Sequence, residues 1–175
     1  LLQDLSLILN IHILPNILER EQQLKDNIAK VKADGAQLIV VIFHWGNETE
    51  TVPDSNQTTL GRIAIDEGAD LVCGHHPHVL QGIEYTEDGP IVYSLGDFWF
   101  NDETKYTGLL NLEITSEGLK QMSFTPCEQK DSQTQYLNNA ESQRALFDHL
   151  QEISPNITID DTGVITELKD IDAES

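Results

Sequence analysis

The sequence predicts an α/β protein with a mixed sheet, in which two βα-type units come first and antiparallel hairpins follow. Two apolar runs, residues 38–43 and 70–73, do not alternate with polar residues. Such runs are typical of strands buried on both faces of a parallel sheet. Helical periodicity over residues 19–34 and 56–67 alternates with these runs. From residue 79 onward, turn signals separate shorter strands, as in antiparallel hairpins.

The first helix is predicted over residues 19–34. Leu24, Ile28 and Val31 recur at helical spacing and define one apolar face. Gly35 follows directly, and glycine is the residue most typical of a helix end. The strand at 38–43 comes next.

The second helix is predicted over residues 56–67. Either Asp54 or Ser55 can serve as its N-cap, because both side chains accept hydrogen bonds from free backbone N–H groups. Gly68 ends this helix, and the short strand at 70–73 follows.

The second half of the chain is expected to be mainly antiparallel, with one helix near its end. The elements predicted there are strands at 79–85 and 91–94 around a turn at 87–90, strands at 109–115 and 119–126 around a turn at 116–118, and a helix at 139–153. At 175 residues we expect one domain. We assign residues 1–153 to it and residues 154–175 to a short, acidic, weakly strand-like tail.

The charge is strongly negative, with 30 acidic against 10 basic side chains and a formal net charge of −20. A chain this acidic repels phosphate backbones, so we expect no nucleic-acid partner and no basic membrane-binding patch. Cys73 and Cys127 are too few for a disulfide framework. The apolar start of the chain is interrupted by Asp4, His12 and Pro15, and therefore predicts neither a signal peptide nor a membrane span.

Histidines follow both predicted parallel strands at the point where each strand ends. His44 comes directly after the first strand, and His75, His76 and His78 come just after the second. Ligands of open α/β sheets bind beyond the carboxyl ends of the strands. Imidazole suits zinc, iron and manganese, so this edge of the sheet is a candidate metal site.

The spacing of these histidines selects three of them. In an extended segment His76 and His78 would point the same way and His75 the opposite way, and Pro77 favours an extended His76. We therefore predict His44, His76 and His78 as metal ligands. The alternative is that all are loop histidines bonded to backbone or solvent, which is our interpretation of His75 and of the isolated His12 and His149.

Two acids lie close to these motifs. Glu48, four residues after His44, is a candidate general acid/base or a group that orients His44, and the alternative is a surface acid among many. Asp97 lies in a Gly96-Asp97 turn after a predicted strand, which is a weak signal taken alone. Trp45 and Trp99 are expected in the core or in a pocket wall.

Three motifs in this order resemble the bacterial capsule-synthesis proteins of the poly-γ-glutamate (CapA-type) family. They are His44-Trp45-Gly46-Asn47-Glu48, then Gly68-Ala69-Asp70-Leu71-Val72-Cys73-Gly74-His75-His76-Pro77-His78-Val79-Leu80-Gln81, and then Ile91-Val92-Tyr93-Ser94-Leu95-Gly96-Asp97-Phe98. The resemblance implies a branch of the calcineurin-like metallophosphoesterases, with an α/β/β/α sandwich and a di-metal site on loops at strand ends.

The resemblance also implies roles for single residues. His44 resembles the family's isolated histidine ligand, and His76 and His78 resemble its closing pair of histidines. Asp97 departs from the usual asparagine, so it adds a negative charge that could act as an extra ligand or weaken binding of an anionic substrate. The cofactor implied is a divalent ion such as Mn, Fe, Zn or Mg, and Glu48 and Asp97 are the candidate catalytic residues.

The chain resembles only the C-terminal half of that domain, because nothing before His44 matches the first-half Asp and Asn-His ligands. The missing half would then be supplied by another part of the protein or by a partner subunit. The function implied is a metal-dependent hydrolase or ligase-complex subunit in capsule or poly-γ-glutamate metabolism, acting on an anionic polymer or a small molecule. The alternative is a non-catalytic extracellular module that handles an anionic polymer. By resemblance the protein is extracellular and tethered to the membrane.

Overall fold

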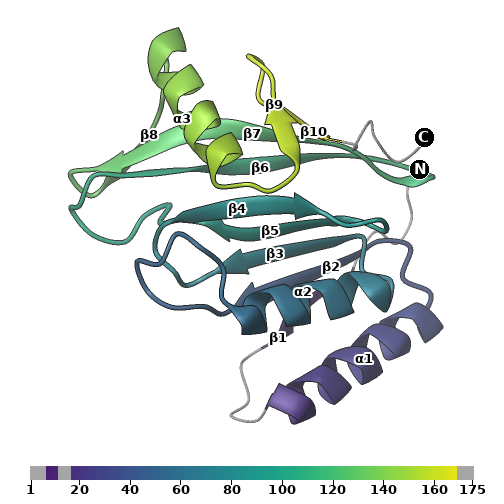
Figure 1. Ribbon diagram of the computed structural model, residues 1–175. Helices are drawn as coiled ribbons and strands as arrows, with labels where there is room; N and C mark the ends of the chain where they lie inside the picture. Colours follow the sequence, from purple (N-terminus) through teal and green to yellow (C-terminus); the bar gives the residue numbers. More distant parts are fainter. Residues whose placement is uncertain (1–6, 12–16, 169–175) are drawn as a thin grey trace, which may run out of the picture.

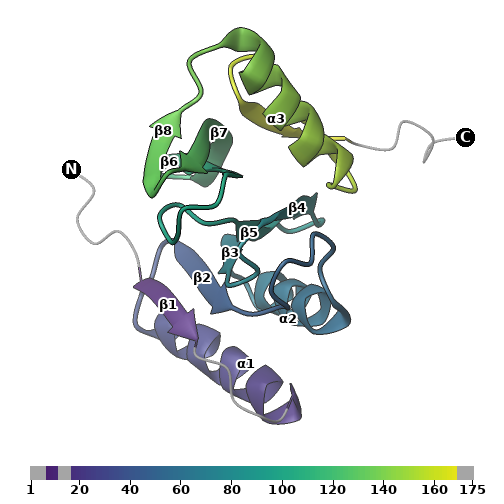
Figure 2. The same cartoon turned by 90° about the vertical axis from the view of Figure 1, so that its left-hand side faces the viewer.

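The structure is a computed structural model that describes residues 7–11 and 17–168. Two sheets stack face to face, and α1 and α2 cover the outer face of the first sheet (Figure 1). Figure 2 shows these layers after a quarter turn, with α1 and α2 below sheet A and sheet B above it.

In chain order the elements are β1 (Leu7–Ile11), α1 (Ile17–Ala33), β2 (Ile39–His44), α2 (Ser55–Asp66), β3 (Leu71–His75), β4 (Leu80–Tyr85), β5 (Pro90–Leu95), β6 (Lys105–Thr115), β7 (Gly118–Lys130), β8 (Gln133–Tyr136), α3 (Ala140–Glu152), β9 (Ile157–Ile159) and β10 (Val164–Glu167).

Sheet A has the strand order β1-β2-β3-β5-β4. Its first four strands are parallel, and β4 pairs antiparallel with β5, so the predicted mixed sheet is confirmed. β1 is an element that the sequence analysis did not predict. Along β2, Ile39, Val41 and Phe43 are buried on the helix side and Val40 packs on the other side, as expected for a strand covered on both faces.

Both predicted helices of the first half are present. Leu24 and Ile28 of α1 are buried against sheet A, as their spacing predicts. Asp54, rather than Ser55, is the N-cap of α2. Its Oδ1 accepts hydrogen bonds from the N–H groups of Asn56 and Gln57, and the Gln57 side chain accepts in return from the Asp54 N–H. This capping box satisfies N–H groups that the first turn leaves unpaired.

The predicted hairpins β4–β5 and β6–β7 are also present. β6 and β7 are longer than predicted and pair in continuous register apart from an irregularity between Glu113 and Ile114. β8, which the sequence analysis did not predict, pairs with the end of β7. Sheet B has the order β6-β7-β10-β9, and all of its pairings are antiparallel.

The segment after residue 153 is part of sheet B as far as Leu168. The sequence predicts an acidic tail there, but Ile157, Ile159 and Ile165 are at most 3% exposed and belong to the second core. Because these apolar residues alternate with polar ones, the segment forms β9 and β10, in line with its weakly strand-like pattern, and is part of the fold. Residues 169–175 lie outside the described residues.

Two apolar cores form on the two faces of sheet A. One lies between α1, α2 and the sheet, and its largest side chains include Trp45 and Tyr93. The other lies between sheet A, sheet B and α3, and it includes Phe124 and Leu146. β3 and β5 thus make apolar contacts on both faces of the sheet, and the candidate ligands lie at the ends of the strands.

A close approach of three strands occurs where β2, β3 and β5 end. The indole Nε1 of Trp45, just after β2, donates a hydrogen bond of 2.9 Å to the carbonyl oxygen of Tyr93 in β5. This bond passes over Gly74 in β3, where an added Cβ would lie 2.2 Å from both Trp45 Nε1 and Tyr93 O. A residue larger than glycine would separate the three strand ends.

Replacing Gly74 by Ala should therefore lower the free energy of unfolding by about 3 kcal/mol or more, because the new methyl group displaces a buried indole and breaks its hydrogen bond. Urea unfolding followed by circular dichroism measures this loss. Gly89→Ala is the matched control, since its Cβ would have no neighbour nearer than 3.3 Å, and it should cost less than about 1 kcal/mol. Equal stability of the two variants would contradict the argument.

Candidate metal centre

The histidines predicted as ligands lie at the carboxyl edge of sheet A. His44 is the last residue of β2 and is paired in register with His75, the last residue of β3. β5, which is parallel to β3, ends nearby at Leu95 and is followed by Asp97. The three loops that follow these strands therefore converge, as the rule for open α/β sheets predicts.

Backbone hydrogen bonds tie the first two of these loops together. Trp45 N donates to His75 O at 3.1 Å, and Thr49 N donates to Pro77 O at 2.7 Å. Glu48 is next to Thr49, and Pro77 lies between His76 and His78. The bond between Thr49 and Pro77 therefore brings the side chains of Glu48, His76 and His78 close together.

A buried chain of amides holds the loop that carries Glu48. Gln81 donates from Nε2 to Glu50 O at 2.8 Å, and its Oε1 accepts from Gln57 Nε2 at 2.8 Å. Gln57 Oε1 accepts from the N–H of Asp54, the cap of α2. Gln57 and Gln81 are at most 1% exposed. Buried amides of this kind are retained where every donor and acceptor has a partner, so the network fixes the loop relative to α2 and β4.

One set of three potential metal ligands lies close together among the described residues: Glu48, His76 and His78. Their ligand atoms are within 4.8 Å of one another, with Glu48 exposed and the two histidines half-buried. Two ligands of one ion with bonds of about 2.1 Å are at most about 4.2 Å apart, so small side-chain rotations would close the set around an ion. One carboxylate and two imidazoles fit a divalent transition metal.

His44 borders this set. Its ring centroid is 4.3 Å from that of His76 and 4.8 Å from that of His75. The structure thus brings together His44, His76 and His78, and it adds Glu48 as a neighbour of His76 and His78. His75, which alternation predicts to point away, lies beside His44 because paired residues of parallel strands emerge on the same face.

The backbone of the histidine loop is not extended, which corrects the reason given for pairing His76 with His78. β3 ends at His75, and φ is +103° at His76 and +61° at His78. Thr49, which bonds to this loop, has φ +66°. Positive φ at residues with a Cβ costs about 1–3 kcal/mol each and tends to cluster at functional sites. Three such residues meet around the candidate ligands, which supports a functional role for the loop.

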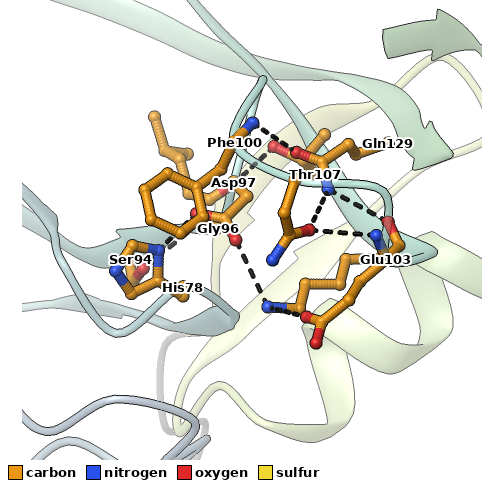
Figure 3. Close-up of polar contacts among 11 residues, drawn as sticks. His78, Ser94, Gly96, Asp97, Phe100, Glu103, Thr107 and Gln129 are labelled. Carbon is orange, nitrogen blue, oxygen red and sulfur yellow. Dashed lines mark hydrogen bonds and ion pairs between the residues drawn. The ribbon is translucent and has the colours of Figure 1, made fainter. Parts of the chain in front are cut away.

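Asp97 contacts His78 on the Nδ1 side of the imidazole ring (Figure 3). Its carboxylate is 7% exposed, with Oδ1 2.6 Å from His78 Nδ1 and Oδ2 3.3 Å from Lys105 Nζ. When His78 Nδ1–H donates to this carboxylate, Nε2 keeps its lone pair and is the free ligand atom. Carboxylates behind metal-binding histidines fix tautomer and ring orientation in this way.

The negative charge of Asp97 is balanced by Lys105. Burial alone would lower the pKa of Lys105, but hydrogen bonds and attraction from Glu103 and Asp97 outweigh it, so that the pKa is raised and the ammonium stays charged. The hydrogen bond from Lys105, which is 2.8 Å from Glu103, lowers the pKa of that carboxyl in turn. The excess charge expected from the sequence at Asp97 is therefore compensated locally.

Several site residues were not identified from the sequence. Lys105 is eight positions after Asp97 in a polar stretch, and Gln57 of α2 and Gln81 of β4 are hydrogen-bonded to each other although they are far apart in the sequence. The signal that could have found Asp97's role is its position two residues after a parallel strand. Trp99, expected in the core or a pocket wall, is 70% exposed, whereas Trp45 is buried. His149 lies on α3, and His12 lies outside the described residues.

A family model and several relatives match parts of this chain. A family model described as bacterial capsule synthesis protein PGA_cap matches residues 6–102. The capsule biosynthesis protein CapA of Bacillus anthracis is 38% identical over 98 residues, covering 54% of this chain and 24% of that protein. The PGA biosynthesis protein CapA of Bacillus subtilis (strain 168) is 38% identical over 96 residues, covering 53% of this chain and 25% of the relative. Protein y4sH of Sinorhizobium fredii is 49% identical over 57 residues, covering 33% of this chain and 12% of that protein.

The chain thus spans about a quarter of the length of the two CapA proteins. The matched stretch contains His44, Glu48, His76, His78 and Asp97. It ends before Lys105, so the partner that balances Asp97 lies outside the matched region.

The strain at His76 predicts an unusual order of stabilities. Because glycine adopts φ +103° freely and alanine does not, His76→Gly should be more stable than His76→Ala by about 1 kcal/mol or more. Thermal melts of the metal-free variants measure the difference. At an ordinary loop position the glycine variant is less stable than the alanine variant, because glycine adds conformational entropy to the unfolded chain. If His76→Gly proves less stable than His76→Ala, the backbone at residue 76 is not strained.

The Asp97 contacts predict that this carboxylate stabilises the fold. Asp97→Ala should lower the free energy of unfolding by about 1–3 kcal/mol, because it removes a partner from both His78 and Lys105 in a partly buried setting. Asp97→Asn should lose less, since its amide oxygen still accepts from His78. The matched control is Glu113→Gln, which breaks the exposed Glu113–Lys120 pair and should change stability by less than about 0.5 kcal/mol. An Asp97→Asn variant more stable than the parent would contradict the compensation by Lys105.

Proposed function

The chain belongs to the family of bacterial capsule synthesis proteins, and on that premise we propose that it takes part in capsule biosynthesis through a divalent-metal centre. The two CapA relatives are named for capsule and PGA biosynthesis, which supports this process. The proposed role is that of a metal-dependent hydrolase, or of a subunit in a ligase complex, acting in poly-γ-glutamate or related capsule metabolism.

The observation that carries the proposal is the convergence of Glu48, His76 and His78 within 4.8 Å on strained loops at the carboxyl edge of sheet A. Asp97 holds His78 with Nε2 available, which is the arrangement of a metal-binding histidine. The positive φ values have a stability cost, and a functional role of this loop would explain why they are retained.

Glu48, His76 and His78 would hold the ion, and His44 is the next side chain within reach. This nitrogen-rich set favours Zn, Fe or Mn over Mg, which prefers oxygen ligands. When bound, such an ion lowers the pKa of a coordinated water and polarises a phosphoryl or acyl oxygen. Asp97 uses both carboxylate oxygens on His78 and Lys105, so its proposed role is to orient His78 rather than to transfer protons. Glu48 is exposed; it remains a candidate general acid/base or orienting group for His44, and its position beside His76 and His78 adds the proposed role of metal ligand.

A second candidate function is a non-catalytic module that handles an anionic polymer through one metal ion. The described residues hold one ligand set with one carboxylate, whereas two-metal hydrolysis uses ions about 3.5–4 Å apart that share bridging acids. For a two-metal hydrolase, the further acidic ligands would have to come from a partner subunit or from the N-terminal half of the domain. Substrate carboxylates could bind to the ion directly, despite the net charge of −20 on the chain.

We further propose an extracellular location, since the capsule relatives imply work at the cell envelope, with tethering by a part of the protein outside this chain. Within the described residues, no helix has the length and apolar character needed to cross a membrane.

The metal centre is tested by titrating the chain with Zn²⁺ and Co²⁺, using calorimetry and the visible absorption of Co²⁺. We expect one weak, saturable site. His76→Ala, His78→Ala and Glu48→Gln should each weaken binding by at least about tenfold, the usual effect of removing a ligand. His149→Ala is the control and should bind as the parent does. Binding that none of the three variants changes would exclude this centre.

The same preparations test catalysis. With one carboxylate in the ligand set, we expect negligible hydrolysis of bis(p-nitrophenyl) phosphate by the metal-loaded chain. Binding of two ions with clear turnover would show that the chain carries a complete hydrolase site and would exclude the non-catalytic alternative. His44→Ala decides whether His44 is a ligand, since only a ligand role predicts a loss of affinity.

A further inference from the structure

The segment that follows β5 contacts the His78 ring through two side chains. Asp97 Oδ1 is 2.6 Å from Nδ1 of the imidazole, and the ring centroid of Phe100 is 4.4 Å from that of His78. Figure 3 shows both side chains beside the His78 ring. The orientation of His78 therefore depends on what holds this segment, and above all on what holds the Asp97 carboxylate.

The backbone on both sides of Asp97 is anchored to sheet B. Thr107 of β6 donates from Oγ1 to Leu95 O at 2.8 Å, and the side chain of Gln129 in β7 accepts from Phe100 N at 2.7 Å. Thr107 and Gln129 are both fully buried, so these bonds are shielded from competing water. With the main chain held before and after Asp97, the freedom that remains is rotation of the Asp97 side chain.

Lys105, the first residue of β6, fixes that rotation. Its Nζ is 3.3 Å from Asp97 Oδ2 and 2.8 Å from Glu103 Oε2. The Lys105 side chain is 18% exposed and that of Asp97 is 7% exposed, so the contact is largely removed from solvent. Figure 3 shows Asp97 between His78 and Glu103. One carboxylate with a different partner on each oxygen has a single favourable orientation.

Loss of Lys105 would leave Asp97 Oδ2 without this partner. A buried carboxylate oxygen without a donor costs free energy, so the side chain would rotate to bring the oxygen to water. Because both oxygens belong to one planar group, this rotation would also move Oδ1 away from His78 Nδ1. The hydrogen bond that leaves Nε2 as the free ligand atom would then be lost.

We propose that Lys105 is a positioning residue of the candidate metal centre, which acts through Asp97 and thereby fixes the tautomer and orientation of His78. This inference rests on the proposed function and deepens it, because it extends the centre from the strand ends of sheet A to sheet B. Lys105 lies beyond residues 6–102, the stretch that matches the family model. The match alone therefore does not identify it.

A charge effect and a positioning effect of Lys105 have opposite signs. Removing an ammonium group near a cation site reduces the repulsion felt by an incoming Zn²⁺, so charge alone predicts tighter binding. A positioning role predicts weaker binding, because the ion would meet a histidine that is no longer held. Lys105→Met separates the two, since it removes the charge and the donor but keeps most of the aliphatic side chain.

The first experiment uses the 175-residue chain without metal and in the presence of chelator. Long-range ¹H–¹⁵N NMR at pH of about 9, where imidazole is neutral and lysine is still charged, shows which ring nitrogen carries the proton. His78→Ala assigns the signals. The parent should carry the proton of His78 on Nδ1. Lys105→Met should shift it towards Nε2, and Lys105→Arg, which keeps a charged donor, should match the parent.

The second experiment is calorimetric titration of the same chains with Zn²⁺. Lys105→Met should weaken binding by about threefold to tenfold, and Lys105→Arg should bind as the parent does. Lys120→Met is the matched control, because it also removes one ammonium group from sheet B but breaks only the exposed pair with Glu113. It should change neither the tautomer nor the affinity.

Thermal melts show whether each variant is folded. If Lys105→Met does not fold, Lys105→Thr takes its place with the same expectations, because threonine suits a strand and is too short to reach Asp97. The inference is overturned if His78 keeps its Nδ1 proton without Lys105, if Zn²⁺ then binds as tightly as before or more tightly, or if Lys105→Arg does not restore the parent behaviour.

The two experiments separate this inference from the proposed function. A chain that binds no Zn²⁺ would exclude the metal function, and the NMR comparison would then decide alone whether Lys105 positions His78. Zn²⁺ binding that is lost in His76→Ala but unchanged in Lys105→Met would support the metal function and exclude the inference.

Discussion

The hydrogen bond from the Trp45 indole to the Tyr93 carbonyl oxygen, passing over Gly74, is the constraint on which the candidate centre depends. It joins the ends of β2 and β5 across β3. The indole and the carbonyl oxygen can approach this closely because Gly74, which lies between them, has no side chain. His44 precedes Trp45, and His76 comes two residues after Gly74. The functional loops are thus brought together by packing on the helix side of sheet A, and their chemistry lies beyond the end of the sheet.

Most of the fold follows from local patterns in the sequence. The continuous apolar runs and the helical spacing of Leu24 and Ile28 specify the βα units, and the turn residues specify the hairpins. β8, β9 and β10 are different, because each has four residues or fewer. Such short strands gain their stability from distant partners, as β8 does from β7, and a local pattern carries little information about distant pairing.

The location of the site was predictable, but its internal arrangement was not. Histidines at the ends of two parallel strands point to the correct edge of the sheet. The positive φ values of His76 and His78 contradict the local preference of a residue before proline and of residues with a Cβ. They are set by tertiary contacts, as is the pairing of Asp97 with Lys105. Local rules fail where the surrounding structure imposes a strained conformation, and such failures are expected at functional sites.

The amide network of Gln57 and Gln81 has a consequence for motion. It joins the Glu48 loop to the cap of α2, so this loop cannot swing open as a hinged lid without breaking buried hydrogen bonds. The half of the centre that carries Glu48 therefore moves as one rigid body with the helix.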